Sequence, residues 1–158
     1  MEDVAAGAGV AKGTPYLYFR SKADLVTAVR DQYGRELVDH AGGLLGPEAA
    51  AEPATRRLEL FATSMFEFII ARQELHHVLF HEAGTSEEEQ LRPVIEMVER
   101  FLRSAIAAGE LRPGDPRFLA TVVVSGVHAA MLPSLHEGNP DRAGFAALTR
   151  DLIARLFG

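Results

Sequence analysis

The sequence predicts an all-α protein, and three observations carry that prediction. Apolar residues recur at helical spacing along most of the chain, and glycine and proline divide the helical stretches from one another. No segment shows the sustained alternation of apolar and polar residues that a half-buried strand would need. Hydrophobic residues make up 47% of the 158 positions, which is enough for a substantial core.

The first helices are short and follow each other closely. Residues 2–8 have helical spacing, and Gly9 follows where the chain must reverse, because glycine adopts a positive φ without steric cost. A second short helix is expected to begin around Lys12. Ser21 is then placed to cap a long helix that runs to about residue 45 and ends at a Gly-Pro pair.

The rest of the chain divides into five further helices. Ser86 is placed to cap one of them, Asp115 precedes another, and Asn139 stands with a proline before the last. The helix that starts after Asp115 is apolar on nearly every side and is expected to stop near Pro133, so it should be buried on more than one side. The expected ranges are residues 54–72, 74–83, 87–108, 116–132 and 140–156.

Composition and charge narrow the classes of protein that the chain can belong to. It has no cysteine, which excludes disulfides and thiolate chemistry and is compatible with a reducing compartment. We find no signal peptide and no apolar run long enough to cross a membrane, so we expect a cytoplasmic protein without a membrane partner. The net charge is −6, but residues 1–35 carry +1 and the remainder −7, so only the N-terminal part suits an approach to DNA.

A dense motif covers the first turn, the second helix and the start of the long helix. Residues 8–25 are Ala-Gly-Val-Ala-Lys-Gly-Thr-Pro-Tyr-Leu-Tyr-Phe-Arg-Ser-Lys-Ala-Asp-Leu, and they include Lys12 and Lys22, the two lysines of the chain. From Val4 to Val29 the sequence resembles the DNA-binding domain of TetR-type bacterial transcriptional regulators. That domain has an Ala-Gly-Val turn, a Lys-Gly-Thr start of the recognition helix, a Tyr-x-Tyr-Phe exit and then Ser-Lys-x-x-Leu.

The resemblance implies an all-α protein in two parts. Residues 1–45 would form a partial helix-turn-helix DNA-binding domain with its linker helix, and residues 46–158 a helical ligand-binding and dimerisation domain. TetR-type regulators have a whole helix ahead of the point where this chain begins. Either the motif is truncated, which we favour, or the protein has lost part of its DNA-binding domain. Pro15 is a second departure, because the family usually has an aliphatic residue there.

Several residues of the motif have the chemistry of DNA contacts. In a helix-turn-helix the start of the second helix reaches base edges, while tyrosine hydroxyls and lysine ammonium groups contact phosphates. Four apolar residues (Val10, Leu17, Phe19 and Leu25) would form the small core that holds these helices together. The residues expected to bind DNA are Ala11, Lys12, Gly13, Thr14, Tyr16, Tyr18 and Lys22.

Two further sets of residues are candidates for ligand binding and for dimerisation. In TetR-type regulators the helices after the linker enclose an inducer pocket, and the final two helices form a four-helix interface between protomers. Ordinary core packing is the alternative for each residue. The candidate pocket residues are Phe61, Met65, Phe68, His77, Phe80, Met97, Phe101 and His128. The candidate dimer residues are Val123, Val127, Met131, Phe145, Leu148, Leu152 and Leu156.

A histidine cluster offers a weak candidate for a metal site. His77 and His81 lie four residues apart and so share a helical face, with His128 or Glu82 as a conceivable third ligand. Exposed or hydrogen-bonding histidines are the alternative. We expect neither a metal nor another cofactor.

Enzymatic activity is not expected. The chain lacks a His-Glu-x-x-His motif, a Gly-x-Ser-x-Gly elbow and a cysteine nucleophile, and its Lys-Gly-Thr order does not fit a Walker phosphate loop. We therefore expect a ligand-responsive homodimeric regulator, a repressor that releases its double-stranded operator DNA when a small apolar molecule binds the C-terminal helices. The alternative is a ligand-binding and dimerisation module that has lost DNA binding.

Overall fold

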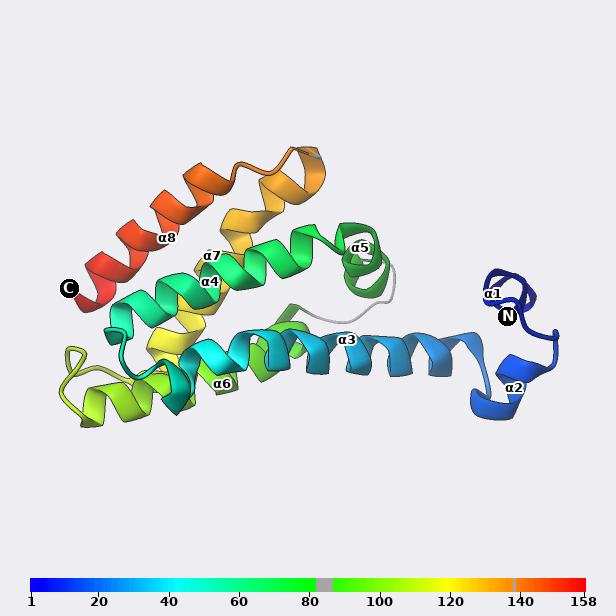
Figure 1. Ribbon diagram of the computed structural model, residues 1–158, viewed down its shortest axis with the longest axis horizontal. Helices are drawn as coiled ribbons and strands as arrows, with labels where there is room; N and C mark the ends of the chain where they lie inside the picture. Colours follow the sequence, from blue (N-terminus) through cyan, green and yellow to red (C-terminus); the bar gives the residue numbers. More distant parts are fainter. Residues whose placement is uncertain (82–86, 138) are drawn as a thin grey trace. The chain divides into compact units, whose positions relative to one another are not determined.

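The all-α prediction is confirmed by a computed structural model, which describes residues 1–81, 87–137 and 139–158. Within these ranges there are helices and no strands (Figure 1). The α-helices are α1 (Glu2–Gly7), α2 (Thr14–Tyr18), α3 (Lys22–Leu45), α4 (Ala54–Ile70), α5 (Gln73–His81), α6 (Glu87–Ala107), α7 (Pro116–Glu137) and α8 (Arg142–Phe157), with a 3-10 turn at Pro47–Ala49.

The chain forms two compact units, and the boundary falls inside α3. The first unit is Met1–Arg35 and the second is Glu36–Gly158. α3 is continuous through the boundary, so one helix contributes its start to the first unit and its last residues to the second. The division into domains at residues 45 and 46 stays a prediction.

The local signals of the first unit have the expected physical roles. Gly9 has a φ of 68°, the left-handed conformation that the turn after α1 needs. Ser21 Oγ accepts a hydrogen bond from the Asp24 N–H at 3.1 Å, and the Asp24 carboxylate accepts one from the Arg20 N–H at 3.0 Å. The bond to Ser21 satisfies an N–H group that the first turn of α3 leaves without a helical partner, so the prediction that Ser21 caps this helix is confirmed. The bond from Arg20 fixes the residue that precedes the cap.

The predicted core of the first unit is wrong. Leu17 is 80% exposed and Val10 is 43% exposed, while Phe19 and Leu25 are only half-buried. The buried side chains of α1 and α2 are instead Ala5 and Pro15, two small residues. With five residues, α2 is too short to bury an apolar stripe of its own, and so its leucine is left at the surface.

The second unit has a core built by large apolar residues from four helices. α6 packs along α7, and α4 packs along α8 (Figure 1). Phe66 of α4 is fully buried and stacks on Phe145 of α8, with ring centroids 4.2 Å apart. Leu58, Leu102 and Val98 are also fully buried. Burying a side chain of this size contributes roughly 1.5–3 kcal/mol, so this layer is the main source of stability in the unit.

Two helix boundaries differ from the sequence-based ranges. α7 does not stop near Pro133 but continues to Glu137. Pro133 and Ala129 are both exposed, so the Ala129 carbonyl, which loses its N–H partner, can accept a hydrogen bond from water instead. The last helix is capped by Asp141, whose carboxylate accepts from the Gly144 N–H at 2.8 Å, rather than by Asn139. Asp115 caps α7 as expected, whereas Ser86 lies outside the described residues.

Helix α7 corrects the sequence-based expectation that no apolar run is long enough to cross a membrane. Pro116–Leu135 of α7 is long and apolar enough to cross a bilayer by length and composition, with a mean hydropathy of 1.7. A core helix of a soluble protein meets the same criterion. α7 supplies buried residues to the core of the second unit, where 33% of the segment is buried.

Candidate DNA-binding surface and ligand cavity

The residues expected to bind DNA lie on a short exposed segment around α2. Ala11, Lys12 and Gly13 form the turn before the helix, so the recognition helix starts two residues later than expected, at Thr14. Tyr16 and Tyr18 are 56% and 76% exposed. Such exposure leaves both hydroxyl groups available to phosphate oxygens.

Two lysines in different surroundings contribute positive charge to this segment. Lys12 Nζ lies 3.1 Å from a carboxylate oxygen of Glu2 in α1, and both side chains are largely exposed. Lys22 is exposed at the first position of α3. Thr14 is half-buried and is the least accessible of the seven residues expected to bind DNA. Whether these residues contact DNA stays a prediction.

An apolar cavity lies among five helices of the second unit. Its volume is about 40 Å³, and its lining comes from α3, α4, α5, α6 and α7. The only side chains in the lining that can form strong hydrogen bonds are two imidazoles, His76, which is buried, and His128, which is half-buried. The lining residues are Leu37, Phe61, Met65, Ile69, His76, Phe80, Leu91, Val94, Val123, Val124, Val127, His128 and Met131.

The structure brings four of the eight candidate pocket residues together. Phe61, Met65, Phe80 and His128 line this cavity. The sequence interpretation missed its aliphatic wall, which comes largely from α7. The signal was present, because a helix that is apolar on nearly every side has a second face to bury, but that face was assigned to dimerisation.

The other four candidates lie elsewhere. The exposed His77 is not in the cavity lining, and the neighbouring His76 takes that place. Phe68 contacts two other side chains. The centroids of the Phe68 and His40 rings are 5.2 Å apart, and the Arg72 guanidinium lies 4.0 Å from the centroid of the Phe68 ring. Met97 and Phe101 line a separate pocket at the end of α3.

The described residues contain no group of three or more histidine, aspartate or glutamate side chains placed to hold a metal ion. His77 is exposed on α5, while the side chains of His81 and Glu82 lie outside the part of the chain that the structure describes. His128 lines the apolar cavity. The structure thus offers no support for a metal centre at the histidine cluster.

The candidate dimer residues fall into two groups. Val123, Val127 and Met131 face the cavity within the protomer, and Phe145 packs on Phe66. Leu148 is 61% exposed, and Leu152 and Leu156 are half-buried. The sequence interpretation missed an apolar face on α7, on which Phe118, Gly126, Ala129 and Pro133 are exposed and Val122 is half-buried.

Comparison with known proteins agrees with the motif in the first unit. Residues 1–29 match the family described as "Bacterial regulatory proteins, tetR family". Over these residues the chain is therefore similar to TetR-type regulators. The family and the similar structures are transcriptional regulators. No curated protein sequence is significantly similar to this chain.

Solved structures of bacterial regulators share the fold over nearly the whole chain. FadR of Bacillus subtilis, determined in complex with stearoyl-CoA, is 22% identical with a TM-score of 0.73, covering 97% of this chain and 84% of that one. The fatty acid degradation regulator FadR of Bacillus halodurans is 21% identical with a TM-score of 0.76, covering 95% and 81%. A TetR/AcrR-family regulator of Thermobifida fusca is 21% identical with a TM-score of 0.64, covering 96% and 84%.

Proposed function

We propose that this chain is a TetR-type, cytoplasmic repressor that releases its operator when a ligand with a long acyl chain enters the apolar cavity. The lining of that cavity is the observation that carries the proposal. Its walls are aliphatic, aromatic and thioether side chains, interrupted by two imidazoles. A chain of methylene groups gains about 0.8 kcal/mol for each CH₂ buried in such surroundings. Similarity of fold to a regulator that binds stearoyl-CoA supports the same ligand class.

The size of the cavity supports a mechanism in which the ligand changes the shape of the protein. A volume of about 40 Å³ is well below that of a protein cavity of about 150 Å³ that holds a benzene molecule. An acyl chain therefore fits only if side chains move apart. Met65 and Met131 are suited to this, because methionine is unbranched and repacks at low cost. The ligand would then bind a widened state more tightly than the narrow one, which is the differential affinity that a switch requires.

α3 is the element that can carry such a change to the DNA-binding unit. Leu37 of α3 lines the cavity, and Lys22 begins the same helix. A shift of α3 at Leu37 would therefore move the start of the helix as well, and with it the recognition segment.

Repression through a palindromic operator requires two protomers, and we propose that α7 and α8 join them. The exposed face of α7 from Phe118 to Pro133 is apolar, and Leu148 adds to it from α8. Each protomer would then present one recognition helix to one half-site.

A second candidate function is supported by the exposure of apolar residues in the first unit. Val4, Val10 and Leu17 are 40%, 43% and 80% exposed, so the helices of the motif share little core. The chain would then act as a ligand-binding and dimerisation module without DNA binding.

The experiment that tests the leading proposal is release of DNA from the protein by stearoyl-CoA. We expect micromolar stearoyl-CoA to dissociate a complex with DNA from upstream of the protein's own gene, and coenzyme A alone to have no effect. Equal effects of the two compounds would show that the acyl chain and its cavity are not the sensor.

A further inference from the structure

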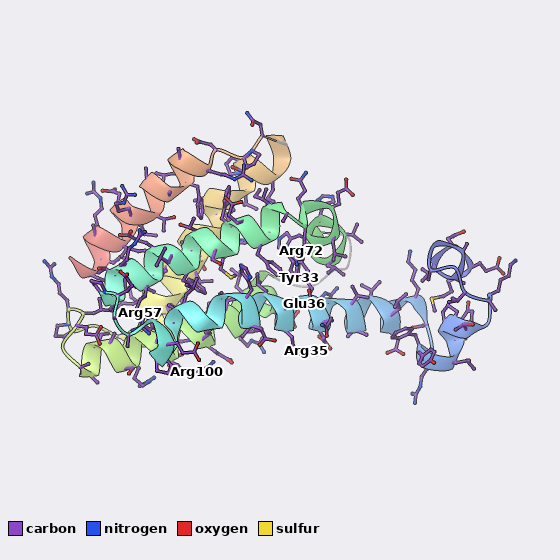
Figure 2. All side chains as sticks on the ribbon, in the orientation of Figure 1. Tyr33, Arg35, Glu36, Arg57, Arg72 and Arg100 are labelled. Atoms are coloured by element: carbon purple, nitrogen blue, oxygen red, sulfur yellow. The ribbon has the colours of Figure 1, made fainter. Side chains whose placement is uncertain are left out.

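A second pocket of the helical unit has a different chemistry from the apolar cavity. Its volume is about 460 Å³, and it lies where the C-terminal end of α3, the start of α4 and the second half of α6 meet. It shares no lining residue with the apolar cavity. Figure 2 shows two arginines, Arg57 and Arg100, at the end of the unit where α3 terminates. The lining residues are Gly42, Leu45, Gly46, Pro47, Ala50, Arg57, Met97, Arg100, Phe101, Ser104, Ala105 and Glu110.

Arg57 places a buried positive charge in this pocket. The residue is 7% exposed, and its guanidinium lies 4.6 Å from the centroid of the Phe101 ring. Nε donates to the Leu44 carbonyl at 3.3 Å, and Nη2 donates to the carbonyls of Leu45 and Gly46 at 2.6 and 2.8 Å. These bonds satisfy the last carbonyls of α3, where the negative end of the helix dipole favours a cation.

The guanidinium nevertheless lacks a carboxylate partner in the described part of the chain. Nη1 donates to none of the described acceptors and is not among the fully enclosed atoms without a partner, and Arg57 is one of the residues that line the pocket. A buried charge is costly unless an opposite charge compensates it. Arg57 therefore has both an uncompensated charge and, at Nη1, donors that no described acceptor uses.

Arg100 adds a second cation from α6, and it too has no ion pair among the described residues. Glu110 is the one acid in the lining and is exposed after the end of α6. The charged side chains of the pocket thus sum to one positive charge. Met97 and Phe101 supply an apolar wall beside the arginines.

We propose that this pocket binds a small organic anion, one that carries a carboxylate or phosphate group next to a flat apolar group. The anionic group would accept hydrogen bonds from Arg57 Nη1 and from Arg100, since guanidinium groups bind carboxylates and phosphates through paired N–H donors. The apolar group lies against Met97 and Phe101. This site is separate from the acyl-chain cavity and does not depend on the function proposed for that cavity.

The site also has a route to regulation. Arg57 holds the last two carbonyls of α3 and the one that follows. An anion that accepts hydrogen bonds from the same guanidinium restrains the Arg57 side chain and thereby stabilises the C-terminal end of α3. Occupancy should therefore stabilise the helical unit, as any ligand that binds only the folded state does.

The test adds two anionic probes and one neutral control to the full chain. Isothermal titration calorimetry measures their binding, and thermal unfolding measures their effect on stability. Benzoate and phenyl phosphate represent the two anionic groups, and benzyl alcohol has the same ring without a charge. We expect at least one anion to bind saturably in a 1:1 ratio, with a Kd in the millimolar range or below, and to raise the unfolding temperature. Benzyl alcohol should bind at least about tenfold more weakly. Absence of saturable binding by either anion, or equal binding by benzyl alcohol, would overturn the proposal.

Two variants with opposite expected effects identify the pocket as the site of binding. Arg100→Gln removes a cation and should weaken anion binding about tenfold or more, whereas Glu110→Gln removes the one acid and should strengthen it several-fold. Both residues are exposed, so neither change should prevent folding. Arg92→Gln is the matched control, because Arg92 is an exposed arginine of α6 outside the lining. Equal binding in Arg100→Gln and Arg92→Gln would show that the pocket is not an anion site and that Arg57 only caps α3.

Binding of stearoyl-CoA by the parent chain, measured beside the anion titrations, separates this proposal from the proposed function. If stearoyl-CoA binds but the small anions do not, only the second site is wrong. If the anions bind and stearoyl-CoA does not, only the acyl-chain cavity is wrong.

Discussion

Lys12 Nζ lies 3.1 Å from a carboxylate oxygen of Glu2, so an acid of α1 pairs with the lysine that precedes the recognition helix. The two side chains are 78% and 69% exposed, and ion pairs with that exposure contribute little stability. A DNA phosphate can therefore replace the carboxylate at small cost. Until it does so, Glu2 lowers the positive potential of the surface that would approach DNA.

The first prediction concerns this pair. Lys12→Ala should weaken DNA binding to a similar degree on every sequence and reduce the slope of log affinity against log salt by about one. Glu2→Gln should strengthen binding, because it removes the competing carboxylate. Titrations of labelled DNA at several salt concentrations measure both effects. Lys22→Ala should behave like Lys12→Ala, and unchanged slopes in both lysine variants would exclude their role as phosphate contacts.

The second prediction concerns the apolar cavity. Val94 is 4% exposed and lines it, so Val94→Phe should fill the 40 Å³ volume and abolish binding of stearoyl-CoA. Overpacking of this kind costs about 1–3 kcal/mol of stability, which circular dichroism during thermal unfolding will detect. Val78→Phe is the matched control, because Val78 is 45% exposed on α5 and lies outside the lining. Unaltered stearoyl-CoA affinity in a folded Val94→Phe protein would place the ligand elsewhere.

The third prediction concerns self-association through α7 and α8. Leu148→Glu puts a charge on the proposed apolar interface and should convert a dimer into monomers in sedimentation experiments, because an unpaired charge is costly to bury there. Ala154→Glu is the control, because Ala154 is exposed on the same helix but six residues further on, and so on another face. Dissociation by both variants, or by neither, would argue against this face as the interface.

The fourth prediction concerns the pH dependence of stability. Glu99 accepts hydrogen bonds from Arg103 at 2.6 Å and from Arg117 of α7 at 3.2 Å, and these arginines lower the pKa of its carboxyl group. A pKa that is lower in the folded state means that the contribution to stability is present above the unfolded-state pKa and is lost as the pH falls through the folded-state pKa. Thermal unfolding from about pH 7 to about pH 3 should therefore change less in Glu99→Gln than in the parent. An identical acid response in the two proteins would show that the Glu99 pairs contribute nothing measurable.

Local rules predicted much of this fold. The positive φ of Gly9, the caps at Ser21 and Asp115, and the end of α3 near Leu45 follow from the conformational preferences of single residues. Pro133 was misjudged for the same reason, because the cost of proline in a helix depends on whether the orphaned carbonyl can reach water, and that depends on tertiary structure.

The sites were harder to predict than the helices. The apolar residues on nearly every side of α7 indicated that several faces of the helix had to be covered. They did not indicate which face lines the cavity and which faces solvent. Val127, which was expected at the dimer interface, lines the cavity, and Phe118, to which no role was assigned, is 66% exposed. Arg57 was missed, because nothing in its local sequence distinguishes a buried arginine from the exposed ones around it. Its burial arises from the meeting of α3, α4 and α6.

The most direct measurement of the central claim is a titration of fluorescent DNA from upstream of the protein's own gene, at low and moderate salt. The chain would be titrated as it stands and also extended by the codons that precede Met1. We predict that at least the extended protein binds this DNA, with a steep dependence on salt. Absence of binding by both forms, at either salt concentration, would contradict the assignment as a DNA-binding repressor and leave the ligand-binding module as the function of the chain.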